Sequence, residues 1–369
     1  MQEGTRKSYY DIEIDIRARL SRGEWGFGDK LPPSRTLAQE YGSSVNTVEK
    51  ALKQIESIGL VRRVPRVGTI ASARVERPAP SGLVAVCVLS IDNPLWTNAL
   101  RGAEDRLRDA GYSMISISHD HDNSRFIGAI DNLAHIPMSG IIVAPIDHDE
   151  ESRVLFPRAI NDMLARGSKV VFMDNYLHAI NVPYVTTDNV SAAYRLTKML
   201  IDKGHQKIGF VRVNHVSTIE NRFSGFRQAC YDSGIPKECA PDFIIHTRNE
   251  DFRDEFDDFH ARFAQYLHDY PVTAVFAGND QIGKAILYSL DKQGKSVPDD
   301  ISMVTYDTDN LLTATARRIT GVRQNFYEMG HLSAEMMLRD MTTNSAEHNR
   351  QFGHIVPSEI ITFDSIKQR

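Results

Sequence analysis

The sequence predicts a small helical domain at the N-terminus, joined by a short linker to a larger α/β body built on doubly wound parallel sheets. The chain has 369 residues, which is too long for one domain of typical size. The composition changes at 76–82, where Pro78 and Pro80 stand among small residues, as in a linker. Apolar strands and amphipathic helices then alternate regularly. We therefore place the first domain at 1–75 and the body at 83–369.

Three helical patterns and a hairpin make up the first domain. Apolar residues spaced three or four apart predict a helix at 9–23, and a serine after two prolines begins a second helix at 34–42. Gly42 ends that helix, and Ser44 or the serine before it caps a third. The stretch 60–72 contains two short apolar runs around a glycine turn, which predicts a β-hairpin, or wing.

The body repeats a strand–helix unit. Its strands are continuous apolar runs, as expected for parallel strands that are buried on both faces. The expected strands are 83–90, 113–118, 140–145, 169–174, 207–213, 242–247, 273–278 and 301–307. The expected helices are 96–112, 125–136, 155–167, 190–203, 220–233, 252–268 and 279–293. So many strands exceed one compact unit, and two lobes are expected.

Charge is distributed unevenly along the chain. Residues 1–80 hold 14 Lys and Arg against 10 Asp and Glu, a net charge of +4, whereas the remainder carries −9. A small basic domain on a large acidic body is typical of a nucleic-acid-binding domain fused to a second domain.

Several classes of protein lack their usual signatures here. The chain contains no apolar run of membrane-spanning length and begins without a secretory signal pattern. Its three cysteines have no metal or redox spacing, which suits the cytoplasm. No phosphate-binding glycine loop follows a strand. The acidic, histidine-containing runs 119–122 and 147–151 are expected to be solvated loops, so we expect no metal and no cofactor.

The second and third helices with the Gly42 turn form a helix-turn-helix pattern. The second helix of such a pair enters the major groove N-terminus first. Short side chains at Ser44, Asn46 and Thr47 would let the backbone approach DNA, and free N–H groups would bind phosphate. The alternative is that these residues only cap a surface helix. The arginine-rich hairpin that follows favours DNA.

Residues 8–73 resemble the GntR-family winged helix-turn-helix, an α+β domain. The matching positions are Gly28, Leu31, Pro32, Arg35, Leu37, Ala38, Gly42, Ser44, Thr47, Val48, Ala51, Leu52, Gly59, Leu60, Gly68 and Thr69. The resemblance implies that residues at the Arg35, Ser44 and Thr47 positions touch DNA and that Gly68 lets the wing enter the minor groove. The whole predicted DNA-binding set is Arg35, Ser44, Val45, Asn46, Thr47, Lys50, Arg62, Arg63, Arg66 and Gly68.

Two positions depart from the family pattern. Val45 stands where the family usually has arginine, and Arg66 stands where it usually has glycine. An apolar Val45 cannot hold a phosphate or a guanine, but it can contact a thymine methyl group. A changed DNA sequence preference is therefore expected.

Residues 83–365 resemble the effector domain of LacI/GalR regulators, which is similar to type I periplasmic sugar-binding proteins. The motifs that carry the resemblance are "SGIIVAP", "VVFMDN", "VTTDNVSAAYRLTKMLIDKGHQKIGFV", "NRFSGFRQAC", "VFAGNDQIGKAILYSLDKQGKSVPDDISMVTYD" and "ITGVRQNFYEMG". A GntR-type domain on this body is the arrangement of arabinose-repressor-like regulators. It implies an N-lobe at about 83–186 and 320–355, and a C-lobe at about 187–319 and 356–369.

The same resemblance implies a set of ligand residues. Arg222 matches an arginine that donates two hydrogen bonds to sugar hydroxyls, and Asp280 and Asp307 match carboxylates that accept from them. Gln324 matches a glutamine near the third crossing between lobes, and Trp96 or Leu95 occupies the apolar position where a ring can cover the C–H face of a sugar.

Asp120 and Asp147 end strands on the same rim and are included in the predicted ligand set. Three other members have alternative roles: Asp280 as a helix cap, Arg222 in a surface ion pair, and Trp96 in the core.

Together these features predict a ligand-responsive transcription regulator, expected to be a repressor. The expected partners are a palindromic operator in double-stranded DNA, a second copy of the chain and a monosaccharide effector. The alternatives are a cytosolic carbohydrate-active enzyme and a solute-binding protein. A glycosidase would need two carboxylates across the scissile bond.

Overall fold

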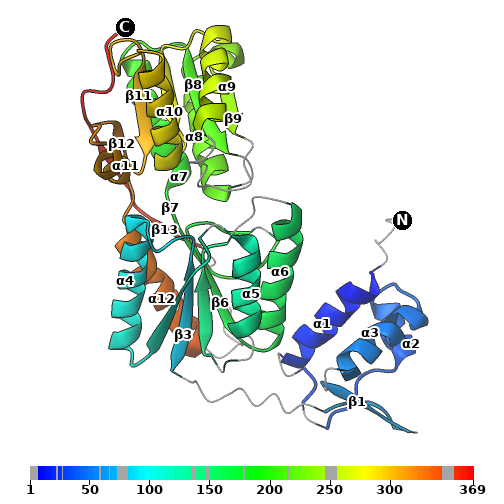
Figure 1. Cartoon of the computed structure of the whole chain (residues 1–369). Coiled ribbons are helices and arrows are strands. Elements are labelled where there is room, and N and C mark those ends of the chain that lie inside the picture. The colour runs from blue at the N-terminus through cyan, green and yellow to red at the C-terminus, as the bar shows by residue number, and fades with distance from the viewer. Residues whose placement is uncertain are drawn as a thin grey trace.

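In the computed structural model, the chain forms an N-terminal domain, which we call the head, and then two stacked lobes (Figure 1). The structure describes residues 7–21, 24–26, 28–57, 60–65, 67–72, 82–120, 122–133, 136, 138–145, 150–177, 179–213, 216–245, 256–342 and 353–369. No helix among them is both long and apolar enough to span a bilayer.

The head is a winged helix-turn-helix, as predicted. Its elements are α1 (Tyr9–Ser21), α2 (Ser34–Glu40), α3 (Val45–Ser57), β1 (Val61–Val64) and β2 (Gly68–Ala71). The two strands pair antiparallel, with Val61 opposite Ala71. Apolar residues from all three helices form one core under the hairpin, because each helix presents a single apolar stripe.

The N-lobe is a six-stranded parallel sheet between two helical layers. The strand order is β13 (Gly353–Val356), β7 (Tyr184–Thr187), β6 (Lys169–Met173), β5 (Gly140–Val143), β3 (Leu83–Val88) and β4 (Ser113–Ser118). Helices α4 (Pro94–Asp109) and α12 (Phe326–Thr342) cover one face, and α5 (Asn123–Leu133) and α6 (Glu150–Ala165) cover the other.

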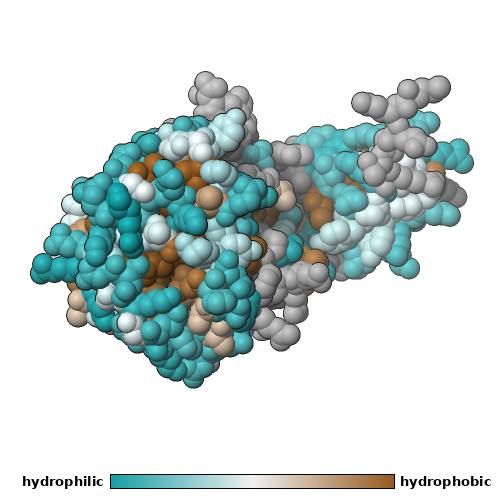
Figure 2. Space-filling model, turned by 90° about the horizontal axis from the view of Figure 1, so that it is seen from above, coloured by the Kyte–Doolittle hydropathy of each residue, from teal (hydrophilic) through white to brown (hydrophobic). Residues whose placement is uncertain are grey.

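The C-lobe has the same architecture with one antiparallel edge strand. The strand order is β14 (Glu359–Ile361), β12 (Thr320–Arg323), β11 (Ser302–Tyr306), β10 (Ala274–Ala277), β8 (Ile208–Val213) and β9 (Asp242–Ile245). Its helices are α7 (Asn189–Asp202), α8 (Ser217–Asp232), α9 (Phe256–Asp269), α10 (Asp280–Lys292) and α11 (Thr308–Thr315), with a 3₁₀ turn at Lys237–Cys239. Seen from the C-lobe end, the surface is mainly hydrophilic, with apolar residues grouped in a few places (Figure 2).

The chain passes between the lobes three times. The passages lie after β7, after β12 and after β13, so Asp188, Gln324 and Pro357 mark them in chain order. The predicted lobe boundary at 320 is therefore wrong: β12 pairs with β11 and belongs to the C-lobe sheet. For the same reason Gln324 lies on the second crossing rather than the third.

Helices α4 and α12 approach each other at the distance that glycine allows. A Cβ atom on Gly330 would lie 1.9 Å from the carbonyl oxygen of Ala99, and one on Gly102 would lie 2.0 Å from that of Tyr327. Both contacts are far below a van der Waals distance. The backbone packing of this N-lobe face therefore depends on these two glycines.

The Gly330→Ala variant should lower the free energy of unfolding by roughly 1–3 kcal/mol or more, because the added methyl group forces α4 and α12 apart. Urea denaturation followed by circular dichroism would measure the change. Gly128→Ala is the matched control, because a Cβ atom on Gly128 in α5 meets nothing within 4 Å. That control should be neutral or slightly stabilising, and an equal loss in both variants would contradict the packing explanation.

Candidate functional site

The N-terminus of α3 is held in place by its own residues. The Ser44 hydroxyl accepts the backbone N–H of Thr47 at 3.1 Å and lies 2.7 Å from the Thr47 hydroxyl. Val48 is fully buried in the head core and fixes the opposite face of the helix. Val45 and Asn46 are left exposed to solvent at the first turn. Capping therefore accounts for Ser44 and Thr47, but not for an exposed valine.

The predicted basic residues differ in whether their charges are paired with carboxylates. Arg35 and Arg62 are exposed, and within the described part of the chain neither forms an ion pair. Arg63 instead lies 2.7 Å from Glu49 and 3.5 Å from Glu56, so two carboxylates of α3 neutralise it. The remaining cations are Lys50, whose Nζ lies 3.9 Å from the Tyr9 ring centroid, and Arg66, which lies outside the described residues.

The turn of the wing requires glycine. Gly68 has a φ of 117°, which is unfavourable for any side chain, and a Cβ atom there would lie 3.0 Å from Cε of Lys30. The predicted turn around Gly68 is therefore confirmed, and entry of the wing into the minor groove stays a prediction.

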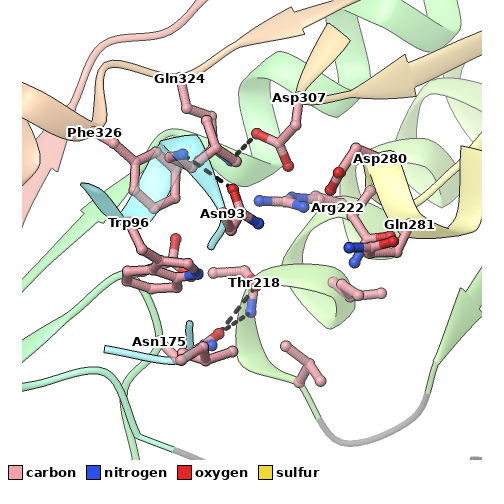
Figure 3. Close-up of a pocket in the computed structure, with 16 residues that line it drawn as sticks. Asn93, Trp96, Asn175, Thr218, Arg222, Asp280, Gln281, Asp307, Gln324 and Phe326 are labelled. Carbon is pink, nitrogen blue, oxygen red and sulfur yellow. Dashed lines mark hydrogen bonds between the residues drawn. The ribbon is translucent and has the colours of Figure 1, made fainter. Parts of the chain in front are cut away.

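A cleft lies between the lobes and receives residues from both (Figure 3). It encloses about 550 Å³ of space that no protein atom fills, part of it open to solvent. Its walls come from the ends of strands and the starts of helices, as expected for doubly wound sheets. Sixteen residues line it: Leu89, Asn93, Leu95, Trp96, Asp174, Asn175, Val216, Thr218, Ile219, Arg222, Asn279, Asp280, Gln281, Asp307, Gln324 and Phe326.

Arg222 is the buried cation of the cleft. Its side chain comes from α8 and is 3% exposed, which excludes the surface ion pair considered above. Its Nε donates to Oδ1 of Asn189 at 2.8 Å, and one terminal nitrogen donates to the Gly278 carbonyl at 2.9 Å. The guanidinium also stacks on Tyr306, 3.9 Å from the ring centroid. These contacts use two of the five N–H donors of the guanidinium.

Two buried carboxylates lie close to this guanidinium (Figure 3). Asp280 is 3% exposed, accepts from the side-chain amide of Asn310 and lies 3.3 Å from Nζ of Lys284. The cap of α10 is Asn279, whose side chain accepts from the N–H of Ile282. Asp280 is therefore not the helix cap, and its carboxylate faces the cleft.

Asp307 is the second buried carboxylate, 5% exposed, and it accepts a 2.7 Å hydrogen bond from Nε2 of Gln324. Burial raises its pKa to about 7. The Arg222 guanidinium opposes this shift, and the neighbouring Asp280 carboxylate adds to it.

Aromatic rings form the N-lobe side of the cleft. Trp96 and Phe326 meet edge to face, with ring centroids 5.1 Å apart. Trp96 is 5% exposed and packs in the N-lobe core, yet it also lines the cleft. Trp96 is therefore both a core residue of the N-lobe and a residue of the cleft wall.

The structure brings together five of the seven predicted ligand residues: Trp96, Arg222, Asp280, Asp307 and Gln324. Asp120 is not among the lining residues; it is exposed and pairs with Arg125 at 2.8 Å. The reason is that β4 is the edge strand of the N-lobe sheet, so its end lies away from the crossings. Asp147 lies outside the described residues.

Polar residues that were not singled out also line the cleft. Asn175 Oδ1 accepts from the N–H of Thr218 at 3.3 Å and from its hydroxyl at 3.0 Å, which joins the N-lobe to the start of α8. Asn93 and Gln281 face the same space. The sequence indicated these residues only by their position, because each lies a few residues after the end of a strand.

The raised pKa of Asp307 predicts a pH dependence of stability. The unfolded chain loses this proton near pH 4, whereas the folded protein keeps it up to about pH 7. Between about pH 4 and pH 7 the free energy of unfolding therefore falls as pH rises, by roughly 1 kcal/mol per pH unit from this group. In urea titrations, the Asp307→Asn variant should gain stability relative to wild type between pH 5 and 7 and then level off. If the stabilities of wild type and Asp307→Asn change with pH in the same way, the raised pKa of Asp307 would be contradicted.

Two family models match separate parts of the chain, one in the head and one in the body. The gntR family of bacterial regulatory proteins matches residues 8–70, and the periplasmic binding protein-like domain matches residues 197–362. An arabinose metabolism transcriptional repressor from Geobacillus stearothermophilus is 26% identical over 376 positions, which cover 100% of both chains.

Solved structures share the fold of the body and, in one case, of nearly the whole chain. The transcriptional regulator CelR in complex with cellobiose covers 98% of this chain and 100% of its own, at 19% identity and a TM-score of 0.67. A LacI family transcriptional regulator from Enterococcus faecium with bound ribose covers 78% of this chain and 99% of its own, at 21% identity and a TM-score of 0.63. The chain thus joins a domain that matches the gntR family of bacterial regulatory proteins to a body that matches the periplasmic binding protein-like domain.

Proposed function

We propose that the protein is a repressor of carbohydrate-utilisation genes, and that a small sugar held between the lobes controls its binding to an operator. One observation carries the proposal: a buried guanidinium and two buried carboxylates meet in a cleft whose walls come from both lobes. As a regulator of DNA, the protein would act in the cytoplasm.

The composition of the cleft favours a neutral polyhydroxylated ligand. Sugar hydroxyls can donate to Asp280 and Asp307 and accept from Arg222, so all three buried groups would gain partners. The edge-to-face pair of Trp96 and Phe326 offers an apolar surface for the C–H face of a sugar ring. The similar proteins also support a sugar ligand, since one relative is named for arabinose metabolism, one solved structure contains ribose and another contains cellobiose.

Control of DNA binding would follow from the movement of one lobe against the other. A ligand that contacts both walls binds the closed arrangement more tightly than the open one and so shifts the population toward it. In a homodimer, this movement would change the spacing of the two heads on a palindromic operator. The effect requires that the ligand distinguish the two states.

The head would bind the operator through α3 and the wing. The N-terminus of α3 would enter the major groove with Val45 and Asn46 leading, and Arg35 would bind phosphate. Because Arg63 is already paired with two glutamates, Arg62 is the freer charge on the wing. Exposed Val45 would favour thymine at the base it meets.

An enzymatic role in the cleft is not favoured. Arabinose and ribose operon repressors are among the curated relatives. A mobility-shift experiment separates the possibilities. It would use DNA from upstream of the neighbouring genes, with and without pentoses, hexoses and disaccharides. Specific retardation that a sugar reverses supports the proposal, whereas no binding at any salt concentration would refute it.

Arg35→Ala should weaken operator binding about tenfold and reduce the slope of log K against log salt by about 1, because one phosphate contact is lost. Fluorescence anisotropy at several salt concentrations would measure both quantities. Arg108→Ala on α4 is the control for a general loss of positive charge and should leave the slope unchanged. Unchanged operator affinity in the Arg35 variant would refute its role.

Arg222→Lys should weaken sugar binding roughly tenfold to a hundredfold while operator binding persists, since an ammonium cannot reproduce the planar fork. Arg222→Ala should abolish the response. Thermal-shift assays with a panel of sugars would report binding, because a ligand of the folded state raises the melting temperature. Arg227→Ala, on the same helix but outside the cleft, should respond as wild type. A normal response in both Arg222 variants would place the ligand elsewhere.

A further inference from the structure

The head touches the N-lobe through α1 and α6 (Figure 1). The Arg17 guanidinium of α1 lies 3.3 Å from the Asp162 carboxylate of α6. In the opposite direction, the Arg158 guanidinium of α6 lies 5.7 Å from the ring centroid of Tyr10 on α1. Each helix therefore supplies one cation to a partner on the other.

The contact residues form a distinct stripe on each helix. Tyr10, Glu13 and Arg17 are spaced three and four apart on α1, beside the residues that face the head core. Glu13 is only 7% exposed and pairs with Arg17 at 3.2 Å. On α6, Arg158 and Asp162 lie one turn apart. Across the contact the two helices form one ion pair and one cation–π pair.

We propose that α6 is a docking surface for the head of the same chain, and that docking holds the two heads of a dimer in the arrangement that a palindromic operator requires. In the docked state Val45 remains 39% exposed at the N-terminus of α3. Arg35 is exposed as well. Docking therefore leaves the DNA-binding surface open. This inference rests on the proposed operator binding.

The strength of the contact suits a reversible arrangement. A partly exposed ion pair and one cation–π contact contribute little on their own. The short linker keeps the head near α6 at an effective concentration in the millimolar range, so a weak contact is still populated. Helix α6 leads through a short turn into β6, and β6 is followed directly by Asp174 and Asn175, which line the cleft. The docking surface is therefore connected along the chain to the proposed effector site.

Charge reversal at Asp162 tests the proposal in the full-length protein. Operator affinity would be measured by anisotropy on a palindromic duplex and on a duplex with a single half-site, selected in vitro for the wild-type protein. Affinity for the palindrome falls in proportion to the docked fraction, so Asp162→Arg should bind the palindrome about tenfold more weakly when charge repulsion lowers the docked fraction to roughly one tenth, and should bind the half-site as wild type does. The Arg17→Asp, Asp162→Arg double variant should recover most of the loss, because the ion pair is restored with opposite polarity.

Asp109→Arg on α4 changes the charge equally at a site away from the head and controls for general attraction to DNA. Thermal melting would establish that each variant is folded. Wild-type affinity of Asp162→Arg for the palindrome would overturn the proposal, as would an equal loss on both duplexes or no recovery in the double variant. A selection that yields no duplex bound by the wild-type protein would instead contradict the operator-binding function on which the inference rests.

Discussion

Burial of charge between the lobes is the constraint on which the rest of the body depends. Removing a guanidinium and two carboxylates from water is expensive unless each finds partners. Asn189, Gly278 and Tyr306 hold Arg222, while Asn310 and Gln324 each donate to one carboxylate. These partners come from separate segments of the chain. The cluster therefore forms only when the C-lobe is folded and the crossing at Gln324 is in place.

The doubly wound architecture supplies the positions that this cluster needs. Parallel strands end at one edge of each sheet, and the two edges face each other across three crossings. Asp174 and Asp307 adopt left-handed backbone conformations, with φ of 66° and 59°, directly after β6 and β11. Such conformations are costly for residues other than glycine and occur often at ligand sites. Both residues line the cleft.

Pattern and position in the sequence were sufficient to predict most of the fold, because buried parallel strands are long apolar runs. The short strands β7, β13 and β14 and the place of β12 were missed, since strands of three or four residues carry little periodic signal. The resemblance located Arg222 and the two aspartates. The resemblance could not show that Glu49 neutralises Arg63 or that Asp120 lies away from the cleft. Both facts depend on which helices and strands become neighbours in the fold.

The chain has two tryptophans, Trp25 in the head and Trp96 in the cleft, which allows ligand binding and operator release to be observed together. In a Trp25→Phe protein, the fluorescence of Trp96 would be titrated with sugar alongside the anisotropy of labelled operator. If a sugar in the cleft controls the heads, one sugar should change both signals over the same concentration range. Operator release without any change at Trp96, or a change at Trp96 without any effect on the operator, would contradict it.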